Sequence, residues 1–320
     1  MDKTFKDKIL TPGFIEPHGH PIIGGISLTR PLLTYLPTAN PYGADFPGLK
    51  TRAEVAAKLR EYVAEAKSTD KPILAWGYDV LVMGGHLTKE DLDKISSTQP
   101  ILVWDASEHY VYANTAALKQ AKITRKHTKT SGIEAGTDGE PNGQFLGVTA
   151  ALVILQPVMN DLLQPEVALK SVKFLMDLSR QNGITTTNEM LYGKLNPDLE
   201  WTILDSYFNS EDSPLRCVVV ADGLTFWNSK QEKAPEYVRD LQKQNTDKLI
   251  FNGVKFFSDD SFVSLGMEMG FPGYIGNYKG MFLTEPGEEM LQQWRPWWEA
   301  GFQIHALPAM ESETKAGSPQ

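Results

Sequence analysis

Hydrophobic and polar positions follow two alternating periods along this chain, and these periods predict helices and strands in turn. After Thr51 the apolar residues Val55, Leu59 and Val63 recur four positions apart, and Thr51-Arg52-Ala53-Glu54 has the form of a capping box. We therefore expect a helix over about residues 51–66, and the same logic starts a short helix at Thr88. Short apolar runs between and after these helices are expected to be strands, at residues 73–76 and 101–104.

In the second half of the chain, predicted helices and strands alternate regularly. Pro165 suits the first turn of a helix, and Gly183 suits its end. Apolar runs then predict four strands, at residues 184–187, 215–220, 253–257 and 302–306. Such alternation is typical of an α/β domain with a largely parallel sheet. Residues 124–147 interrupt this alternation, because their polar, glycine-rich sequence predicts a loop or a hairpin.

Composition narrows the class of protein. The 320 residues are 41% hydrophobic and 22% charged, which is typical of a globular protein, and the net charge of −9 argues against a nucleic-acid partner. No apolar run approaches the ~20 residues that span a membrane. Because the charged amino terminus also lacks a secretory signal, we expect no membrane partner and a cytoplasmic location. The single cysteine, Cys217, excludes an internal disulfide.

Two histidines near the start of the chain carry the strongest chemical signal. They close the run Pro12-Gly13-Phe14-Ile15-Glu16-Pro17-His18-Gly19-His20, which follows an apolar stretch over residues 8–15 that we expect to be a short buried strand. His18 and His20 are two positions apart, so both imidazoles should point to the same face. Histidine is the commonest metal-binding side chain near neutral pH, so the pair predicts two metal ligands. Two capped turn histidines are the alternative.

Two later residues join this pair. Lys255 lies within an otherwise apolar strand, where a lysine is costly unless it is paired or chemically altered. His305 lies late in the last predicted strand. In an α/β barrel, functional groups gather at the carboxyl ends of successive strands, where both of these residues and the histidine pair fall. A buried ion pair of Lys255 with Asp259 or Asp260 is the alternative.

Four motifs occur in a fixed order: Pro-Gly-Phe-Ile-Glu-Pro-His-Gly-His, Asn-Gly-Ile-Thr-Thr-Thr, Val-Lys-Phe-Phe-Ser-Asp and Ile-His. Together they resemble the amidohydrolase superfamily, in particular the branch that includes N-substituted formamide deformylases. The resemblance implies a (β/α)8 TIM barrel of the metal-dependent hydrolase type in a single domain, residues 1–320, with residues 30–160 as a long insertion after the first strand. The motifs cover about the first five strands, so we expect an incomplete barrel, truncated at both ends. Its open sheet edges would favour a homo-oligomer.

The resemblance also implies roles for individual residues. His18 and His20 would bind a divalent metal, and Lys255 matches the lysine that is carboxylated in many relatives and bridges two metals. His305 would be a further ligand, and Lys255 and His305 would form the catalytic set. Substrate-binding roles are implied for four side chains: Trp76, Asp79, His109 and Asp259. For His109, a plain hydrogen-bonded histidine is the alternative. Asp259 matches a Lys-x-x-x-Asp pattern, but the glycine that normally follows it is Asp260 here.

The function implied by the resemblance is hydrolysis of a C–N bond, other than a peptide bond, in a small-molecule amide or N-formyl compound. A metal-activated water would attack, with one or two divalent ions, expected to be Zn²⁺, as cofactor. The alternative is a truncated, catalytically inactive remnant that binds only metal or a partner, because the sixth-strand histidine and eighth-strand aspartate of the family have no counterpart here. A metal-independent sugar- or peptide-binding barrel that uses Trp76 and Trp104 is a third possibility. We expect His86 and His127 to be exposed and without a role.

Overall fold

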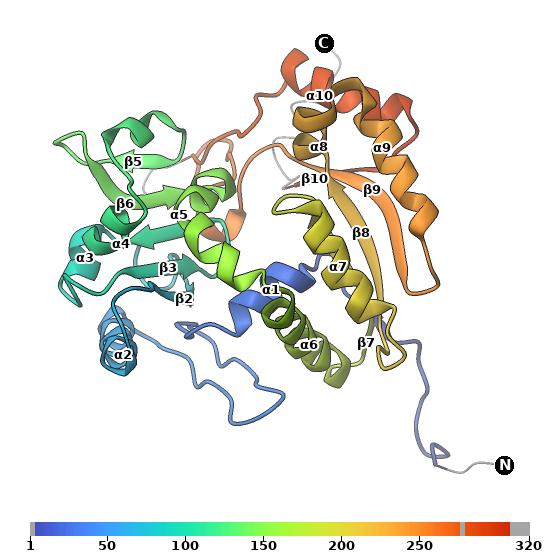
Figure 1. The fold of residues 1–320 in the computed structure, drawn as a ribbon, viewed down its shortest axis with the longest axis horizontal. Coiled ribbons are helices and arrows are strands. Elements are labelled where there is room, and N and C mark those ends of the chain that lie inside the picture. Colours follow the sequence, from blue (N-terminus) through green and yellow to red (C-terminus); the bar gives the residue numbers. More distant parts are fainter. Residues whose placement is uncertain (1–3, 276–278, 308–320) are drawn as a thin grey trace.

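The computed structural model describes residues 4–275 and 279–307, in which the strands form two five-stranded sheets (Figure 1). The first sheet is parallel throughout and contains, in spatial order, β1 (Phe14–Ile15), β7 (Ile184–Tyr192), β8 (Arg216–Asp222), β9 (Leu249–Phe257) and β10 (Ile304–Leu307). The second sheet is mixed and contains, in spatial order, β2 (Ile73–Tyr78), β3 (Ile101–Asp105), β4 (Tyr110–Ala113), β6 (Pro141–Leu146) and β5 (Ile133–Ala135). The α/β class predicted from the sequence pattern is confirmed.

Helices lead from each strand of the first sheet to its parallel neighbour, and the sheet is curled like half of a barrel (Figure 1). The helices of this part are α6 (Pro165–Gln181), α7 (Pro197–Phe208), α8 (Gly223–Lys230), α9 (Ala234–Leu241) and α10 (Glu288–Glu299). Three short 3-10 helices accompany them, η2 (Gln231–Lys233), η3 (Gln242–Gln244) and η4 (Phe262–Ser264). A closed eight-stranded barrel stays a prediction.

The second sheet is formed by the chain between β1 and β7. Besides α6, the helices in this interval are α1 (Pro21–Leu28), α2 (Arg52–Glu65), α3 (Lys89–Asp93), α4 (Thr115–Gln120), η1 (Arg125–Lys129) and α5 (Val148–Leu162). The polar segment at 124–147 contains the antiparallel pair β5–β6, so the hairpin alternative is the correct one. The sheet ends in this hairpin, with β5 as its last strand.

Local sequence fixes the helix ends that the sequence pattern predicted. The side chains of Thr51 and Glu54 cap α2 reciprocally, and those of Thr88 and Asp91 do the same for α3. Proline stands in the first turn of both α6 and α7, where its missing N–H costs nothing. The helices predicted over about 51–66, from Thr88 and from Pro165 are therefore confirmed.

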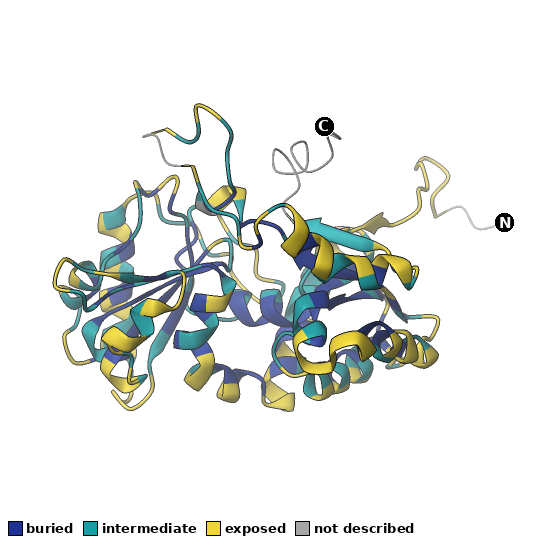
Figure 2. Cartoon of the chain, turned by 90° about the horizontal axis from the view of Figure 1, so that it is seen from above, coloured by how far each residue is buried: buried dark blue, intermediate teal, exposed yellow. Residues whose placement is uncertain are grey.

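One continuous hydrophobic cluster joins the two sheets. It contains Trp104 and Val111 from the second sheet, Val219 and Phe256 from the first, and Ile154 from α5, all of them nearly inaccessible to water. Figure 2 shows that buried segments run through the interior of both halves. Because the cluster is shared, burial of its apolar surface stabilises both sheets and their relative placement.

The first strand differs from its prediction. A buried strand was expected over residues 8–15, but β1 spans only Phe14 and Ile15, whose exposed fractions are 66% and 67%. The reason is its position at the edge of the first sheet, where it pairs with β7 on one side only. An apolar run does not distinguish an edge strand from a central one, because burial depends on what packs against it.

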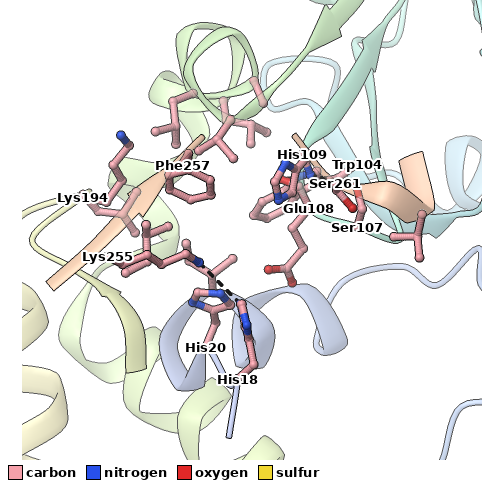
Figure 3. A pocket seen from close by; sticks show the side chains of 18 of the residues that line it. His18, His20, Trp104, Ser107, Glu108, His109, Lys194, Lys255, Phe257 and Ser261 are labelled. Atoms are coloured by element: carbon pink, nitrogen blue, oxygen red, sulfur yellow. Dashed lines mark hydrogen bonds between the residues drawn. The ribbon is translucent and has the colours of Figure 1, made fainter. Parts of the chain in front are cut away.

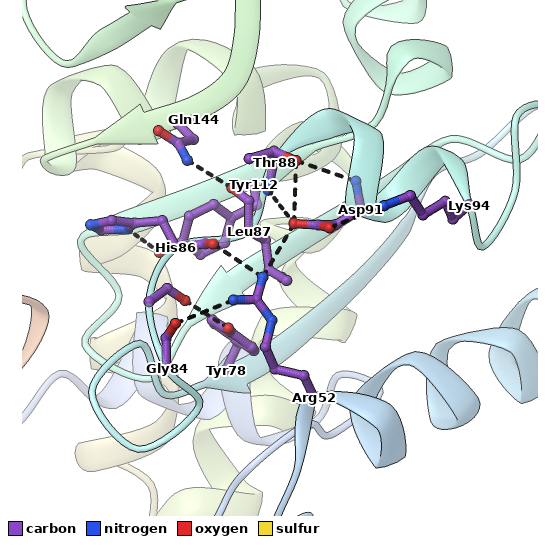
Figure 4. A network of polar contacts seen from close by, with 11 residues as sticks. Arg52, Tyr78, Gly84, His86, Leu87, Thr88, Asp91, Lys94, Tyr112 and Gln144 are labelled. Carbon is purple, nitrogen blue, oxygen red and sulfur yellow. Dashed lines mark hydrogen bonds and ion pairs between the residues drawn. The ribbon is translucent and has the colours of Figure 1, made fainter.

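His86 also differs from its prediction of being exposed without a role (Figure 4). It is half-buried, and its Nδ1 lies 2.8 Å from the hydroxyl of Tyr112. Burial lowers the pKa of His86, which favours the neutral ring. Arg52 of α2 donates to the backbone oxygens of Gly84 and His86 and pairs with Asp91, so this network holds the loop after β2 against the second sheet (Figure 4).

Among the described residues, no helix combines the length and the apolar composition that crossing a membrane requires. The cytoplasmic location expected from the sequence stays a prediction. The single-domain organisation with residues 30–160 as its insertion also stays a prediction.

Candidate active site

Polar residues gather where the strands of the first sheet end. His18 and His20 lie in the short segment between β1 and α1, and Asp222 is the last residue of β8. In the register of the sheet, Asp222 pairs with Lys255 of β9, and Lys255 pairs with His305 of β10. Because the carboxyl ends of parallel strands meet at one edge, the fold brings these side chains together from four separate segments of the chain.

The histidine pair stands against the lysine (Figure 3). The ring centroids of His18 and His20 are 5.5 Å apart, and Nζ of Lys255 lies 3.5 Å from Nε2 of His18. Gly19 permits this placement, since a Cβ there would lie 2.7 Å from the Thr187 hydroxyl of β7. Glycine thus lets the segment between the two histidines lie directly against the neighbouring strand.

Glu189 completes this side of the site, and the sequence analysis missed it. It lies late in β7 with 2% of its surface exposed, and its Oε1 is 3.3 Å from Nδ1 of His20. As a carboxylate it accepts that Nδ1–H, so Nε2 of His20 keeps its lone pair. The other carboxylate oxygen accepts the N–H of Ile22. Three threonines and an asparagine directly precede it in β7, so the signal that identified Lys255, a charge within an apolar strand, was absent here.

Burial sets the protonation of these groups. Desolvation, followed by the nearby charge of Lys255, lowers the pKa of His18 to about 4 and that of His20 well below its usual value. Desolvation also lowers the pKa of Lys255 to about 8 and raises the pKa of Glu189 to about 7. Both imidazoles are therefore neutral near pH 7, which is the form that binds a metal.

A pocket of about 330 Å³ opens beside this group, between the two sheets (Figure 3). Its polar lining consists of His18, His20, Ser107, Glu108, His109, Lys194, Lys255 and Ser261. Its apolar lining consists of Ile23, Trp104, Val148, Ala151, Leu152, Leu155, Met159, Leu191, Leu195, Phe257, Phe262 and Val263. Helix α5 supplies much of the apolar wall, so an uncharged substituent would be held there.

The wall opposite the histidine pair comes from the turn between β3 and β4. His109 lies there, and its Nδ1 contacts Oδ1 of Asp260, a residue of the segment after β9. Glu108, beside it, has a positive φ of 66°, and desolvation raises the pKa of its carboxyl to about 7. The indole N–H of Trp104 donates to the Glu108 carbonyl and fixes this turn.

The pocket lining unites four of the eight residues singled out from the sequence: His18, His20, His109 and Lys255. The other four lie outside it. The ring of His305 lies over Gly253, where an added Cβ would be 2.9 Å from Nε2, and that buried nitrogen has no hydrogen-bond partner in the described part of the chain. Burial lowers the pKa of His305.

The other three residues outside the lining hold local structure. The carboxylate of Asp79 accepts the N–H groups of Leu81 and Val82 at the start of the loop after β2. The indole of Trp76 packs against the shared core, and its buried N–H has no partner among the described residues. Asp259 is fully buried and accepts the N–H of Glu268.

The side chains at this site supply part of the ligand set that a metal ion requires. No group of three His, Cys, Asp or Glu side chains in the described ranges is placed to hold one. His18 and His20 nevertheless supply two neutral imidazoles, and Lys255 stands beside them. Two imidazoles and one oxygen donor, carried by Lys255 once its amine is carboxylated, would fit a divalent ion of the zinc type.

The chain belongs to the amidohydrolase family, whose model matches residues 6–278. The Exoenzymes regulatory protein AepA of Pectobacterium carotovorum subsp. carotovorum is 33% identical over 124 residues, which are 36% of this chain and 23% of that protein. Protein LONG AFTER FAR-RED 3 of Arabidopsis thaliana is 24% identical over 276 residues, 82% of this chain and 42% of that protein. The Putative amidohydrolase YtcJ of Bacillus subtilis is 24% identical over 149 residues, 46% of this chain and 26% of that protein.

Two solved structures share the fold. Both are described as uncharacterized metal-dependent hydrolases, from Pyrococcus horikoshii and Pyrococcus furiosus. The first has a TM-score of 0.54 at 16% identity and the second a TM-score of 0.53 at 15% identity. The alignments cover 92% and 95% of this chain but only 52% and 57% of those chains. The chain thus spans less than half of each curated relative named above and little more than half of each solved one.

Proposed function

We propose that this chain is a metal-dependent hydrolase that cleaves a C–N bond in a small-molecule amide or N-formyl compound. The observation that carries the proposal is the convergence of His18, His20 and Lys255 on one pocket at the carboxyl edge of a curled parallel sheet. Membership of the amidohydrolase family and the metal-dependent hydrolase neighbours support it.

His18 and His20 would hold the metal through their neutral imidazoles, and Lys255 would provide an oxygen donor once its amine is carboxylated. The lowered pKa of Lys255, about 8, makes the neutral amine that this modification requires more available. A bound divalent ion, expected to be Zn²⁺ as one or two ions, would polarise the scissile carbonyl and lower the pKa of its water. His305 would become a further metal ligand only if its ring turned away from Gly253.

Residues around the proposed metal ligands would orient the substrate and exclude water. Glu189 fixes the tautomer of His20 by accepting its Nδ1–H, as an outer carboxylate does in metal sites. The apolar wall from α5 would hold the substituent of the amide. Trp76, Asp79 and Asp259 lie outside the pocket lining. The substrate contacts predicted for them stay predictions.

Metal content tests this proposal directly. The protein is loaded with zinc, freed of excess ion, and measured by elemental analysis on the monodisperse size-exclusion peak. We expect about one to two zinc ions per chain, lost when His18→Ala and His20→Ala are combined. His127→Ala is the matched control, because His127 caps η1 and lies outside the pocket lining, and it should retain the metal.

A well-folded wild-type protein without metal would refute the hydrolase proposal for this chain. Retention of metal together with no turnover of any amide in a screen would favour the second candidate, a catalytically inactive remnant that only binds metal or a partner. The absence of a three-ligand cluster in the described ranges is the observation that keeps this candidate in view. Truncation relative to an eight-stranded barrel, and assembly into a homo-oligomer, stay predictions.

A further inference from the structure

The pocket has two walls of different origin, and only one of them carries the proposed metal ligands. His18, His20 and Lys255 come from the first sheet. His109 comes from the turn of the second sheet and faces them across the pocket (Figure 3). A group in that position faces the space in which a substrate and its attacking water would lie.

His109 is anchored by a carboxylate from a distant part of the chain. Its Nδ1 contacts Oδ1 of Asp260, a residue 151 positions away, and the Asp260 side chain is fully buried. An ionised carboxylate can only accept hydrogen bonds, so Nδ1 carries the hydrogen and Nε2 of the neutral ring carries the lone pair. With Nδ1 held by Asp260, Nε2 is the ring nitrogen left for the pocket. The contact therefore fixes both the tautomer and the orientation of the ring.

The protein encloses Asp260 closely. A Cβ added to Gly266 would lie 2.6 Å from the Asp260 Cβ, and one added to Gly147 would lie 3.2 Å from its Oδ2. Oδ1 also accepts the N–H of Ser261, while the buried Oδ2 has no partner in the described part of the chain. A buried carboxylate with an unpartnered oxygen is costly, so its position beside His109 requires a compensating role.

Asp260 is also the position at which the chain departs from the family pattern. In the family that this chain resembles, the Lys-x-x-x-Asp pattern is followed by glycine. In this chain the pattern begins at Lys255, and Asp260 stands where that glycine would be. The departure thus introduces the carboxylate that contacts Nδ1 of His109.

We propose that His109 is a catalytic residue that transfers the proton from the attacking water to the leaving amine, and that Asp260 is its positioning residue. The proposal rests on the hydrolase function proposed above and adds a proton carrier to it. A histidine oriented by a buried carboxylate is the arrangement that suits this task.

The proton transfer balances in two steps. In the first, Nε2 of His109 accepts a proton from water as the water oxygen forms a bond to the acyl carbon, and Asp260 stabilises the imidazolium. In the second, that N–H gives its proton to the amide nitrogen as the C–N bond breaks. The products are a carboxylic acid and an amine, and His109 returns to its neutral form.

Two probes with different leaving groups test this role. Hydrolysis of p-nitroacetanilide expels an amine that must be protonated, whereas hydrolysis of p-nitrophenyl acetate expels a stable phenolate. We expect His109→Ala to lower kcat for the anilide by about 10²–10⁴-fold and to lower ester hydrolysis less, because the ester loses only the first of the two proton transfers. His109→Gln serves as a second variant in case the alanine variant does not fold.

Asp260→Asn keeps an oxygen that can accept the Nδ1–H but removes the charge. It should lower kcat for the anilide while KM stays within about twofold, and ¹⁵N NMR should show the Nδ1–H tautomer of His109 in the wild type. Asp161→Asn is the matched control, because its carboxylate pairs with the exposed Lys71 and lies outside the pocket lining. If the His109–Asp260 contact only held the two sheets together, Asp260→Asn would instead lower anilide and ester hydrolysis equally.

Three results would overturn the inference. One is unchanged anilide hydrolysis in a folded His109→Ala protein. Another is the Nε2–H tautomer in the wild type. The third is an anilide-selective loss in Glu108→Gln that His109→Ala lacks, because the proton carrier would then be Glu108. Failure of the wild type to hydrolyse either probe would instead refute the hydrolase function itself, so the two failures are distinguishable.

Discussion

Glu108 holds a backbone conformation that few residues with a side chain adopt. Its φ of 66° lies in the left-handed region, where a Cβ crowds the following carbonyl at a cost of roughly 1–2 kcal/mol. The hydrogen bond from the Trp104 indole to its carbonyl, 2.9 Å long, and the neighbouring contact of His109 with Asp260 hold the turn in place. Strain of this kind at a pocket is consistent with a functional constraint on the turn.

Replacing this residue should therefore stabilise the protein. Glycine reaches the left-handed region without the penalty, and the change also removes a carboxyl whose buried position raises its pKa to about 7. We expect Glu108→Gly to raise the free energy of unfolding by about 1 kcal/mol, a shift of roughly 1–2 °C in Tm for a chain of 320 residues. Calorimetry measures it, and Glu61→Gly in the middle of α2 should lower stability. A lower Tm for Glu108→Gly would contradict the strain argument.

The connection from β7 to α7 illustrates how one side chain shapes an element boundary. Glu200 is 2% exposed, and its carboxyl oxygens accept the N–H groups of Gly193, Leu195 and Asn196 at 2.7–2.8 Å. These bonds satisfy backbone donors of a turn that contains no regular structure. Desolvation dominates nonetheless and raises the pKa of Glu200 from 4.5 to about 7.

This shift gives the stability of the protein a pH dependence of known sign. Between pH 4.5 and 7 the folded state keeps a proton on Glu200 that the unfolded state loses, so stability falls as the pH rises. The contribution is on the order of 3 kcal/mol across this range. Urea unfolding at pH 5 and pH 7 should show a smaller difference for Glu200→Gln than for the wild type. The variant should also be less stable at both values, because its amide –NH2 faces a backbone N–H. An equal difference in both proteins would contradict the assignment.

At the scale of the whole molecule, α5 joins two sheets that are separate in hydrogen bonding. Ile154 on this helix is 1% exposed and belongs to the cluster that contains residues of both sheets. Ile154→Ala should lower the free energy of unfolding by about 2–4 kcal/mol through lost burial and the cavity left behind. Tryptophan fluorescence and far-ultraviolet circular dichroism should follow one shared transition in both proteins. Two separated transitions would show that the sheets unfold independently.

The sequence by itself determined the elements and half of the site. Capping residues and proline positions act within a few residues of the chain, so α2, α3 and α6 were predictable, as were the strands of the first sheet after β1. The spacing of His18 and His20 and the unusual position of Lys255 also depend only on local pattern. These features are local because capping, side-chain alternation and desolvation of a charge in an apolar run are short-range effects.

Only the tertiary structure decided what lies opposite those residues. The contact of His109 with Asp260 spans 151 positions, and it exists because a shared core fixes the second sheet against the first. The direction of the His305 ring depends on the space over Gly253 in the neighbouring strand. The exposure of β1 depends on its place at the sheet edge. Each of these depends on long-range packing, and that packing is set by the whole core and not by the residues near each position in the chain.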